Sequence, residues 1–407
     1  MIRWQRSLRE REFIVLMSAI MALNAVAIDL ALPAFDNIRD AFDLGADSNE
    51  TARIITTYFL GMAVAQLFWG PITDRFGRRP ILFLGFGLYS LGAVASALAP
   101  SLGVLLVARL FWGIGAACVR VVATAIVRDR HAGDAMARVM AYVMAVFLLV
   151  PVIAPAIGAA IVAVAPWQWV FWSSVLYCAL VAVWALRMGE SLPPERRMPI
   201  RLRGMSSAFA RILRTPATVG PLVAMIAGMG PFTSFLASSE LIVGEIFGRP
   251  TQFPIVFGVI GIANGITSVA NGRLVSRFGM RRVVDIAYRV YLPVTVVTLA
   301  IALTNGGIST FWWFIPAFTI TLSFHLIFIP NLNAMAMEPL GDIAGSAAAI
   351  LGAVSMATGA VLGSIIDSRI DSTGTVAPIA WGLFIAAIVG LIAVRWTLSR
   401  AEPAPGG

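Results

Sequence analysis

The chain contains no lysine, only two cysteines and two histidines, and few charged residues of any kind. Charged residues make up 13% of its 407 residues, whereas they make up roughly 25% of an ordinary soluble domain. A water-soluble protein of this length needs more charge on its surface, so a soluble enzyme and a disordered regulator are excluded. The two cysteines lie in apolar runs and exclude a disulfide framework or a cysteine-rich metal cluster.

Apolar residues dominate instead, at 59% of the chain, with a mean hydropathy of +0.86. This composition indicates an all-α polytopic membrane protein, because one membrane-spanning helix needs about 20 apolar residues. We expect twelve transmembrane helices, at about 13–35, 51–72, 80–99, 103–127, 138–163, 168–188, 217–242, 252–272, 284–304, 310–333, 343–367 and 376–398.

The arginines predict the orientation of these spans, because positive residues favour cytoplasmic loops. With both termini in the cytoplasm, 24 of the 30 arginines lie on the cytoplasmic side and four lie outside. The remaining two, Arg109 and Arg120, fall inside the fourth span. This distribution accounts for the net charge of +9, so we expect the lipid bilayer as a partner and no nucleic acid.

A basic linker at 191–214 divides the chain into an N-terminal six-helix half, 1–190, and a C-terminal six-helix half, 215–400. Residues 401–407 form a tail. Within the linker, residues 206–213 are predicted to form a short helix on the inner membrane surface. The sequence therefore predicts two halves with separate helical bundles.

The two halves share an internal repeat. The sequence Gly-Pro-Ile-Thr-Asp-Arg-Phe-Gly-Arg-Arg follows the second span at 70–79, and Gly-Arg-Leu-Val-Ser-Arg-Phe-Gly-Met-Arg follows the eighth at 272–281. The two segments lie 202 residues apart (272 − 70), which is close to half of the chain. Two parallel six-span repeats are the plan of one large class of transporters.

Three segments resemble motifs of the major facilitator superfamily. The loop at 70–80 is similar to its signature loop, residues 109–129 to its fourth-span motif in drug exporters, and residues 29–34 to its first-span motif in twelve-span drug:proton antiporters. The chain most resembles the bicyclomycin/chloramphenicol-resistance type. This resemblance implies the major facilitator fold and proton-coupled drug export.

The fifth span partly resembles the Gly/Pro-rich motif of antiporters in this family. Pro151, Pro155 and Gly158 share one helix face, and each proline removes a backbone hydrogen bond. We therefore expect a pliable and closely packed helix at this position.

Asp29 is the only carboxylate that we expect deep within a span. A charged side chain at this depth is costly, so it usually faces a wet cavity and has a function. Asp29 can bind a proton or a cationic substrate, and competition between the two is a minimal antiport mechanism. The resemblance implies this proton and substrate role, and we expect Arg109 to be the counter-charge of Asp29. A purely structural role for either residue is the alternative.

Arg120 departs from the family motif, in which relatives usually carry an uncharged residue. Arg109, Gly113, Ala116 and Arg120 fall on one helical stripe, where the small residues leave room for a cavity or a close helix partner. Arg120 can favour an anionic or carboxylate-bearing substrate, or it can pair with a lipid phosphate at the inner leaflet.

The signature loop is predicted to form a cytoplasmic gate. Asp74 can accept hydrogen bonds from Arg78 or Arg128, and Gly77 permits a tight turn. Positive charge that only sets the topology is the alternative. The predicted gate residues are Gly70, Asp74, Arg75, Gly77, Arg78, Arg79 and Arg128.

Other side chains in the spans are candidates for an adaptable substrate cavity, because methionine and aromatic residues adapt to different ligands. Each of them is also compatible with a structural role, and His325 with a proton relay. The cavity candidates are Arg120, Tyr58, Met62, Met144, Met225, Met229, Phe232, Asn264 and His325.

The leading functional prediction is proton-coupled efflux of small amphiphilic compounds, including antibiotics, by a monomer in the inner membrane of a bacterium. A dedicated exporter or importer of one metabolite, with or without a carboxylate, and a non-transporting sensor or scaffold are the alternatives. The sequence contains no metal-ligand spacing, Gly-x-Ser-x-Gly segment or nucleotide-binding loop, so we expect neither an enzyme nor a cofactor.

Overall fold

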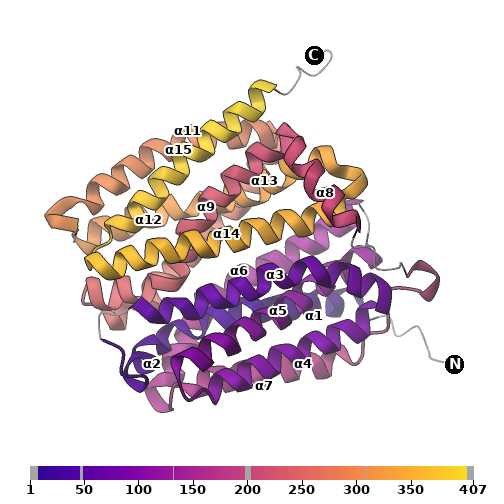
Figure 1. Ribbon diagram of the computed structural model, residues 1–407, viewed down its shortest axis with the longest axis horizontal. Coiled ribbons are helices and arrows are strands. Elements are labelled where there is room, and N and C mark those ends of the chain that lie inside the picture. Colours follow the sequence, from indigo (N-terminus) through magenta and orange to yellow (C-terminus); the bar gives the residue numbers. More distant parts are fainter. Residues whose placement is uncertain (1–7, 46–48, 132, 198–202, 308, 401–407) are drawn as a thin grey trace. The chain divides into compact units, whose positions relative to one another are not determined.

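The computed structural model describes residues 8–45, 49–131, 133–197, 203–307 and 309–400, and these residues contain no β-strand. The chain divides into two compact units, Met1–Arg201 (unit 1) and Leu202–Gly407 (unit 2). Within each unit the long helices run side by side (Figure 1). The all-helical class predicted from composition is confirmed for the described residues.

Unit 1 contains seven α-helices and three short 3₁₀ segments in its described part. The first helix is followed by a short 3₁₀ segment that contains Pro33. In chain order the elements are α1 (Glu10–Asp29), η1 (Leu32–Ala34), α2 (Phe35–Ala41), η2 (Asn49–Thr51), α3 (Ala52–Phe76), α4 (Arg78–Ala97), α5 (Leu102–Arg130), α6 (Gly133–Val164), α7 (Gln168–Ala185) and η3 (Pro194–Arg196).

Unit 2 begins with α8, an amphipathic helix that includes the short helix predicted at 206–213. The span predicted at 310–333 is divided into two helices at Phe324. In chain order the elements are α8 (Arg203–Arg214), α9 (Pro216–Leu241), the π-helical η4 (Ile242–Ile246), η5 (Pro250–Gln252), α10 (Phe253–Phe278), α11 (Met280–Ala302), η6 (Thr304–Gly307), α12 (Phe311–Ser323), α13 (His325–Met337), η7 (Glu338–Ile343), α14 (Ala344–Thr373) and α15 (Ala377–Arg400).

Eleven helical segments in the described part of the chain are long and apolar enough to cross a membrane. Val152–Val164, which belongs to α6, is a shorter apolar helix. The fifth predicted span, at 138–163, falls in this same helix. The structure thus describes a multi-pass helical protein with eleven candidate spans, and the twelfth remains a prediction.

The internal repeat recurs in the backbone. Gly77 separates α3 from α4 with a φ of +99°, and Gly279 separates α10 from α11 with a φ of +78°. Both residues adopt a conformation that strains side chains with a Cβ atom, so glycine permits the sharp reversal. The two turns lie 202 residues apart (279 − 77), the offset of the sequence repeat.

In unit 1, α5 packs closely against α3 and α4 through glycines. A Cβ atom at Gly113 would overlap the backbone carbonyl of Tyr58, and one at Gly61 would overlap the carbonyl of Leu110. On the other side, a Cβ atom at Gly92 would lie 2.5 Å from Cα of Trp112. The small residues predicted along α5 therefore serve close helix partners, which leaves the backbones of three helices in direct contact.

Candidate functional site

The Asp29 carboxylate lies at the last residue of α1 and is buried, with 3% of the residue exposed. The chain does not continue as α-helix beyond this point, because η1 and its Pro33 follow. No hydrogen bond or ion pair of this carboxylate occurs within the described part of the chain. Asp29 is therefore a buried acidic group that no basic side chain neutralises there.

The predicted ion pair between Asp29 and Arg109 is wrong in this structure. Arg109 is fully buried, and its Nη1 donates to the carbonyl oxygen of Ala27 at 2.9 Å while Nε donates to that of Ile54 at 3.2 Å. Its Nη2 has no hydrogen-bond partner among the described residues. The physical reason is that α1 and α3 offer backbone acceptors to Arg109, so its guanidinium joins these two helices.

Aromatic rings complete the surroundings of Arg109. Its Cζ lies 4.8 Å from the ring centroids of both Tyr58 and Trp112, and 5.9 Å from that of Phe171. Such stacking stabilises a guanidinium in a desolvated place. Arg109 is thus held by three rings and two carbonyl groups, which explains how a charge without a carboxylate partner is accommodated here.

Tyr58 lies near three charged side chains of unit 1. Asp29, Arg109 and Arg120 all interact electrostatically with its phenol group. The ring is fully buried, and its hydroxyl has no hydrogen-bond partner among the described residues. Met62, one turn further along α3, is also buried. Two cavity candidates, Tyr58 and Met62, therefore belong to the contact between α3 and α5.

Arg120 differs from Arg109 in its exposure. Its side chain is exposed, and no ion pair, side-chain hydrogen bond or ring contact of its guanidinium occurs in the described ranges. Its backbone carbonyl accepts a hydrogen bond from the hydroxyl of Thr124 at 3.0 Å. Helix α5 thus carries one buried arginine, Arg109, and one exposed arginine, Arg120.

The helix that carries the partial Gly/Pro motif packs against the end of α1. A Cβ atom at Gly158 would overlap the carbonyl oxygen of Leu30 and lie 3.2 Å from Cδ of Pro33. Pro155 is buried in the same helix, whereas the side chains of Pro151 and Met144 lie outside the described residues. The close packing predicted for this helix is confirmed at Gly158, directly beside the residue that follows Asp29.

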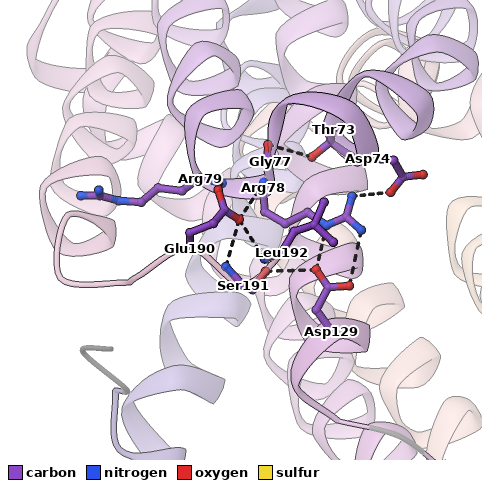
Figure 2. A network of polar contacts seen from close by, with 9 residues as sticks. All are labelled: Thr73, Asp74, Gly77, Arg78, Arg79, Asp129, Glu190, Ser191 and Leu192. Carbon is purple, nitrogen blue, oxygen red and sulfur yellow. Dashed lines mark hydrogen bonds and ion pairs between the residues drawn. The ribbon is translucent and has the colours of Figure 1, made fainter. Parts of the chain in front are cut away.

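The signature loop forms a polar network that joins α3, α4 and α5 (Figure 2). Arg78 donates through Nη1 to Asp74 at 2.5 Å and through Nε to Asp129 at 2.8 Å. The hydroxyl of Ser191 donates to the same Asp129 at 3.1 Å. The contact predicted between Asp74 and Arg78 is confirmed, and Asp129 is a partner that the sequence analysis did not name.

Glu190 is a second member of the network that the sequence analysis did not identify. Its carboxylate accepts the backbone N–H groups of Arg78 at 2.9 Å and Arg79 at 3.1 Å, and also those of Ser191 and Leu192 (Figure 2). The first two are N–H groups of the first turn of α4, where a negative charge also interacts favourably with the helix dipole. Glu190 therefore ties the segment after α7 to the start of α4.

The other predicted gate residues surround this network without forming ion pairs in the described part of the chain. Arg79 donates to the carbonyl oxygen of Leu186 at 3.2 Å, and Arg75 lies 5.6 Å from the ring of Phe76. Arg128 is exposed, and the position of Gly70 leaves open space for a Cβ atom. Only part of the predicted set thus takes part in the network of Figure 2.

In unit 2, His325 is the centre of the cavity candidates. Its two ring nitrogens lie 2.9 Å from the carbonyl oxygen of Gly228 and 3.2 Å from that of Leu322. Phe232 stacks on its ring, with centroids 5.8 Å apart. His325 and Met225 line one small cavity within unit 2. The structure therefore brings these three candidates together.

The remaining two candidates lie apart from this cavity lining. Met229 packs at Gly359, where a Cβ atom would lie 2.6 Å from its own Cβ. Asn264 is half-buried, and its Oδ1 has no hydrogen-bond partner among the described residues.

The prediction that Asp29 is the only deep carboxylate is also wrong. Asp367 in α14 is 5% exposed and accepts hydrogen bonds from Ser234 at 2.5 Å and Ser238 at 2.8 Å, both in α9. Glu240, near the end of α9, is 4% exposed. The sequence places both residues near the edges of predicted spans, whereas the candidate spans of the structure extend to Ile246 and Thr373, and both side chains are buried.

Eleven candidate membrane spans, a backbone repeat and a polar loop network after α3 define a transporter built from two helical units. A sequence profile described as Major Facilitator Superfamily matches residues 14–364. The chain belongs to this superfamily of membrane transporters, and it is a transporter and not an enzyme.

The curated relatives agree with this assignment. The chain is 28% identical over 390 residues to a bicyclomycin resistance protein homolog of Haemophilus influenzae, covering 95% of this chain and 96% of that protein. It is 28% identical over 387 residues to the uncharacterized MFS-type transporter YdgK of Bacillus subtilis, covering 93% of each. The multidrug resistance protein MdtL of Escherichia coli is 28% identical over 301 residues, which cover 66% of this chain and 75% of MdtL.

Solved structures show the same fold at low sequence identity. The human organic anion transporter MFSD10 has a TM-score of 0.70 and 16% identity, with 96% of this chain and 100% of that chain covered. A D-xylose-proton symporter has a TM-score of 0.72 and 14% identity, with 95% and 97% covered.

Proposed function

We propose that the protein is a proton-coupled exporter of small amphiphilic compounds, acting as a monomer in the inner membrane of a bacterium. The observation that carries the proposal is the Asp29 carboxylate, which is buried in α1 without an ion pair in the described structure. The names of the relatives, bicyclomycin resistance and multidrug resistance, support an antibiotic among the exported compounds.

In this mechanism Asp29 binds either a proton or the positive group of a substrate. A proton that enters from outside displaces the substrate, and deprotonation toward the cytoplasm restores the ionised carboxylate. Arg109 forms no ion pair with Asp29 in the described structure, and two of its nitrogen atoms donate to carbonyl groups of α1 and α3. It therefore acts as a positioning residue that couples the end of α1 to α3.

Export also requires the binding site to open alternately to the two sides of the membrane. We expect the halves 1–190 and 215–400 to rock against each other, as in other transporters built from two repeats. The network around Arg78 serves as the cytoplasmic gate. Its three carboxylates, Asp74, Asp129 and Glu190, keep the ends of the unit 1 helices in one arrangement during this movement.

The proposal is tested with purified protein in proteoliposomes under an imposed pH gradient, with ethidium as the amphiphilic cation. Asp29→Asn keeps the shape of the side chain and removes its charge, so gradient-driven ethidium transport should fall to the level of empty liposomes. Asp43→Asn is the matched control: Asp43 is exposed and has a φ of 52°, a conformation that asparagine also adopts.

Transport by the wild type that is indifferent to the gradient, or transport by Asp29→Asn equal to that by Asp43→Asn, would refute the mechanism. Gradient-independent transport of a single metabolite would favour a dedicated carrier. Binding without any transport would favour a sensor or scaffold.

A further inference from the structure

Unit 1 holds two opposite charges that are not paired with each other or with other described side chains. Two carbonyl groups and three aromatic rings surround the Arg109 guanidinium, whereas Asp29 and Arg120 have no such contacts among the described residues. Both interact electrostatically with the phenol group of Tyr58, so they lie in the same neighbourhood. An uncompensated charge inside a membrane protein is costly, and it is usually compensated by a partner of opposite sign.

Of these two side chains, Arg120 is the exposed one and can contact a ligand directly. Its side chain is exposed, and its guanidinium offers five N–H donors in a planar fork that matches a carboxylate. Arg120 precedes Arg130, the last residue of α5, by ten residues, or about 15 Å of helix. The hydrocarbon core is about 30 Å thick, so this distance is about half of it and favours a substrate carboxylate over a lipid phosphate as the partner of Arg120.

Tyr58 provides an independent sign that a ligand group is missing. Its hydroxyl is completely buried and has no hydrogen-bond partner among the described residues. Buried hydroxyl groups are normally hydrogen-bonded, so the Tyr58 hydroxyl is available to a polar group of a ligand.

We propose that unit 1 recognises zwitterionic substrates, with the ammonium group of the substrate at Asp29, its carboxylate at Arg120 and the Tyr58 hydroxyl as a further hydrogen-bonding group. This assignment deepens the proposed function and rests on it for the competition between proton and ammonium at Asp29. The carboxylate of the substrate binds at Arg120 and the proton binds at Asp29. The carboxylate therefore adds affinity without blocking the exchange of proton and ammonium group at Asp29. A substrate with charges on opposite ends fits better than an α-amino acid, because Asp29 and Arg120 form no direct contact with each other.

Three compounds that share one fluorescent ring system separate the two charges. Ciprofloxacin is a zwitterion at neutral pH, its methyl ester carries only the positive charge, and its N-acetyl derivative carries only the negative charge. Their binding is measured by fluorescence on the purified full-length protein in nanodiscs of phosphatidylcholine. The wild type should bind the zwitterion about tenfold more tightly than either derivative, as expected for one charge-assisted contact.

Two variants assign each charge to its residue. Arg120→Gln should bind the zwitterion and the methyl ester equally while it still prefers the zwitterion over the N-acetyl compound. Asp29→Asn should show the converse pattern. Arg120→Glu should bind the methyl ester more tightly than the zwitterion, which distinguishes lost recognition from a misfolded protein. Arg53→Gln, an exposed arginine at the start of α3, is the control and should bind like the wild type.

The inference is overturned if the wild type binds the methyl ester as tightly as the zwitterion, or if Arg120→Gln keeps the full preference for the zwitterion. It is also overturned if anionic phosphatidylglycerol in the nanodisc abolishes that preference, because Arg120 then pairs with lipid. Gradient-driven export of the methyl ester without any zwitterion preference would remove only this inference. The expected binding pattern without gradient-driven transport would remove only the proton-coupled mechanism.

Discussion

Replacing Gly92 by alanine should destabilise unit 1 through the α4–α5 contact. A Cβ atom at this position would lie 2.5 Å from both Cα and Cβ of Trp112, whereas ordinary contact begins at 3.4 Å. The two helices must therefore separate by about 0.9 Å (3.4 − 2.5) at this point. Trp112 is fully buried, and its ring lies against Tyr89 at 5.2 Å and against the Arg109 guanidinium at 4.8 Å, so it has little freedom to yield.

The expected cost follows from two opposing terms. Overpacking of this kind costs typically about 1–3 kcal/mol. Alanine is about 0.5–1 kcal/mol more favourable than glycine within a helix, which offsets part of this cost. We expect Gly92→Ala to lower the free energy of unfolding by roughly 1–2 kcal/mol. Gly87→Ala is the matched control, because Gly87 lies in the same helix with no atom within 4 Å of its Cβ position.

Cysteine labelling measures this effect directly. Cys118 and Cys178 are both fully buried in unit 1, so a fluorogenic maleimide reacts with them only when the unit opens. On heating in one detergent, Gly92→Ala should expose its thiols at a lower temperature than the wild type, and Gly87→Ala at the same or a higher temperature. Labelling of Gly92→Ala at or above the temperature of Gly87→Ala would refute the packing argument.

Two further predictions concern the carboxylates that the sequence analysis missed. Glu190→Gln removes the negative charge that lies beside the first turn of α4, so it should destabilise unit 1 by about 1 kcal/mol in the same labelling assay. Glu195→Gln changes an exposed position and should leave the labelling temperature unchanged. Equal labelling curves for the two variants would contradict the capping role of Glu190. Asp367→Asn weakens two hydroxyl contacts between α9 and α14, so it should destabilise unit 2 by roughly 1–3 kcal/mol, measured by tryptophan fluorescence on heating. Exposed Glu245→Gln is its control, and identical melting curves would show that these contacts contribute nothing.

Local patterns predicted much of the fold. Long apolar runs gave the approximate positions of the candidate spans, and the repeated Gly-containing loop predicted two equivalent turns, which occur at Gly77 and Gly279. The small residues along α5 predicted either a cavity or a close helix partner, and the structure shows the close partner at Gly113. Such features depend on neighbours along the chain, so the sequence is sufficient to find them.

Partners that lie far apart in the sequence were predicted less well. Arg109 was expected to pair with Asp29, but it donates to the carbonyl oxygens of Ala27 and Ile54. A backbone acceptor leaves no signature in the sequence. Glu190 lies 112 residues from Arg78, and Asp367 lies 133 residues from Ser234. These contacts arise from how helices pack, and no local pattern of residues marks them.

The glycine contacts of unit 1 also restrict how its helices can move. Gly61 and Gly113 join α3 to α5, and Gly92 and Gly115 join α4 to α5, each through direct backbone contact. Sliding one of these helices by a fraction of a turn would drive a side chain of its neighbour into the glycine position. Helices α3, α4 and α5 are therefore expected to move together as one rigid body. Any internal rearrangement of unit 1 during a transport cycle therefore has to occur outside these three helices, for instance where α1 ends at Asp29.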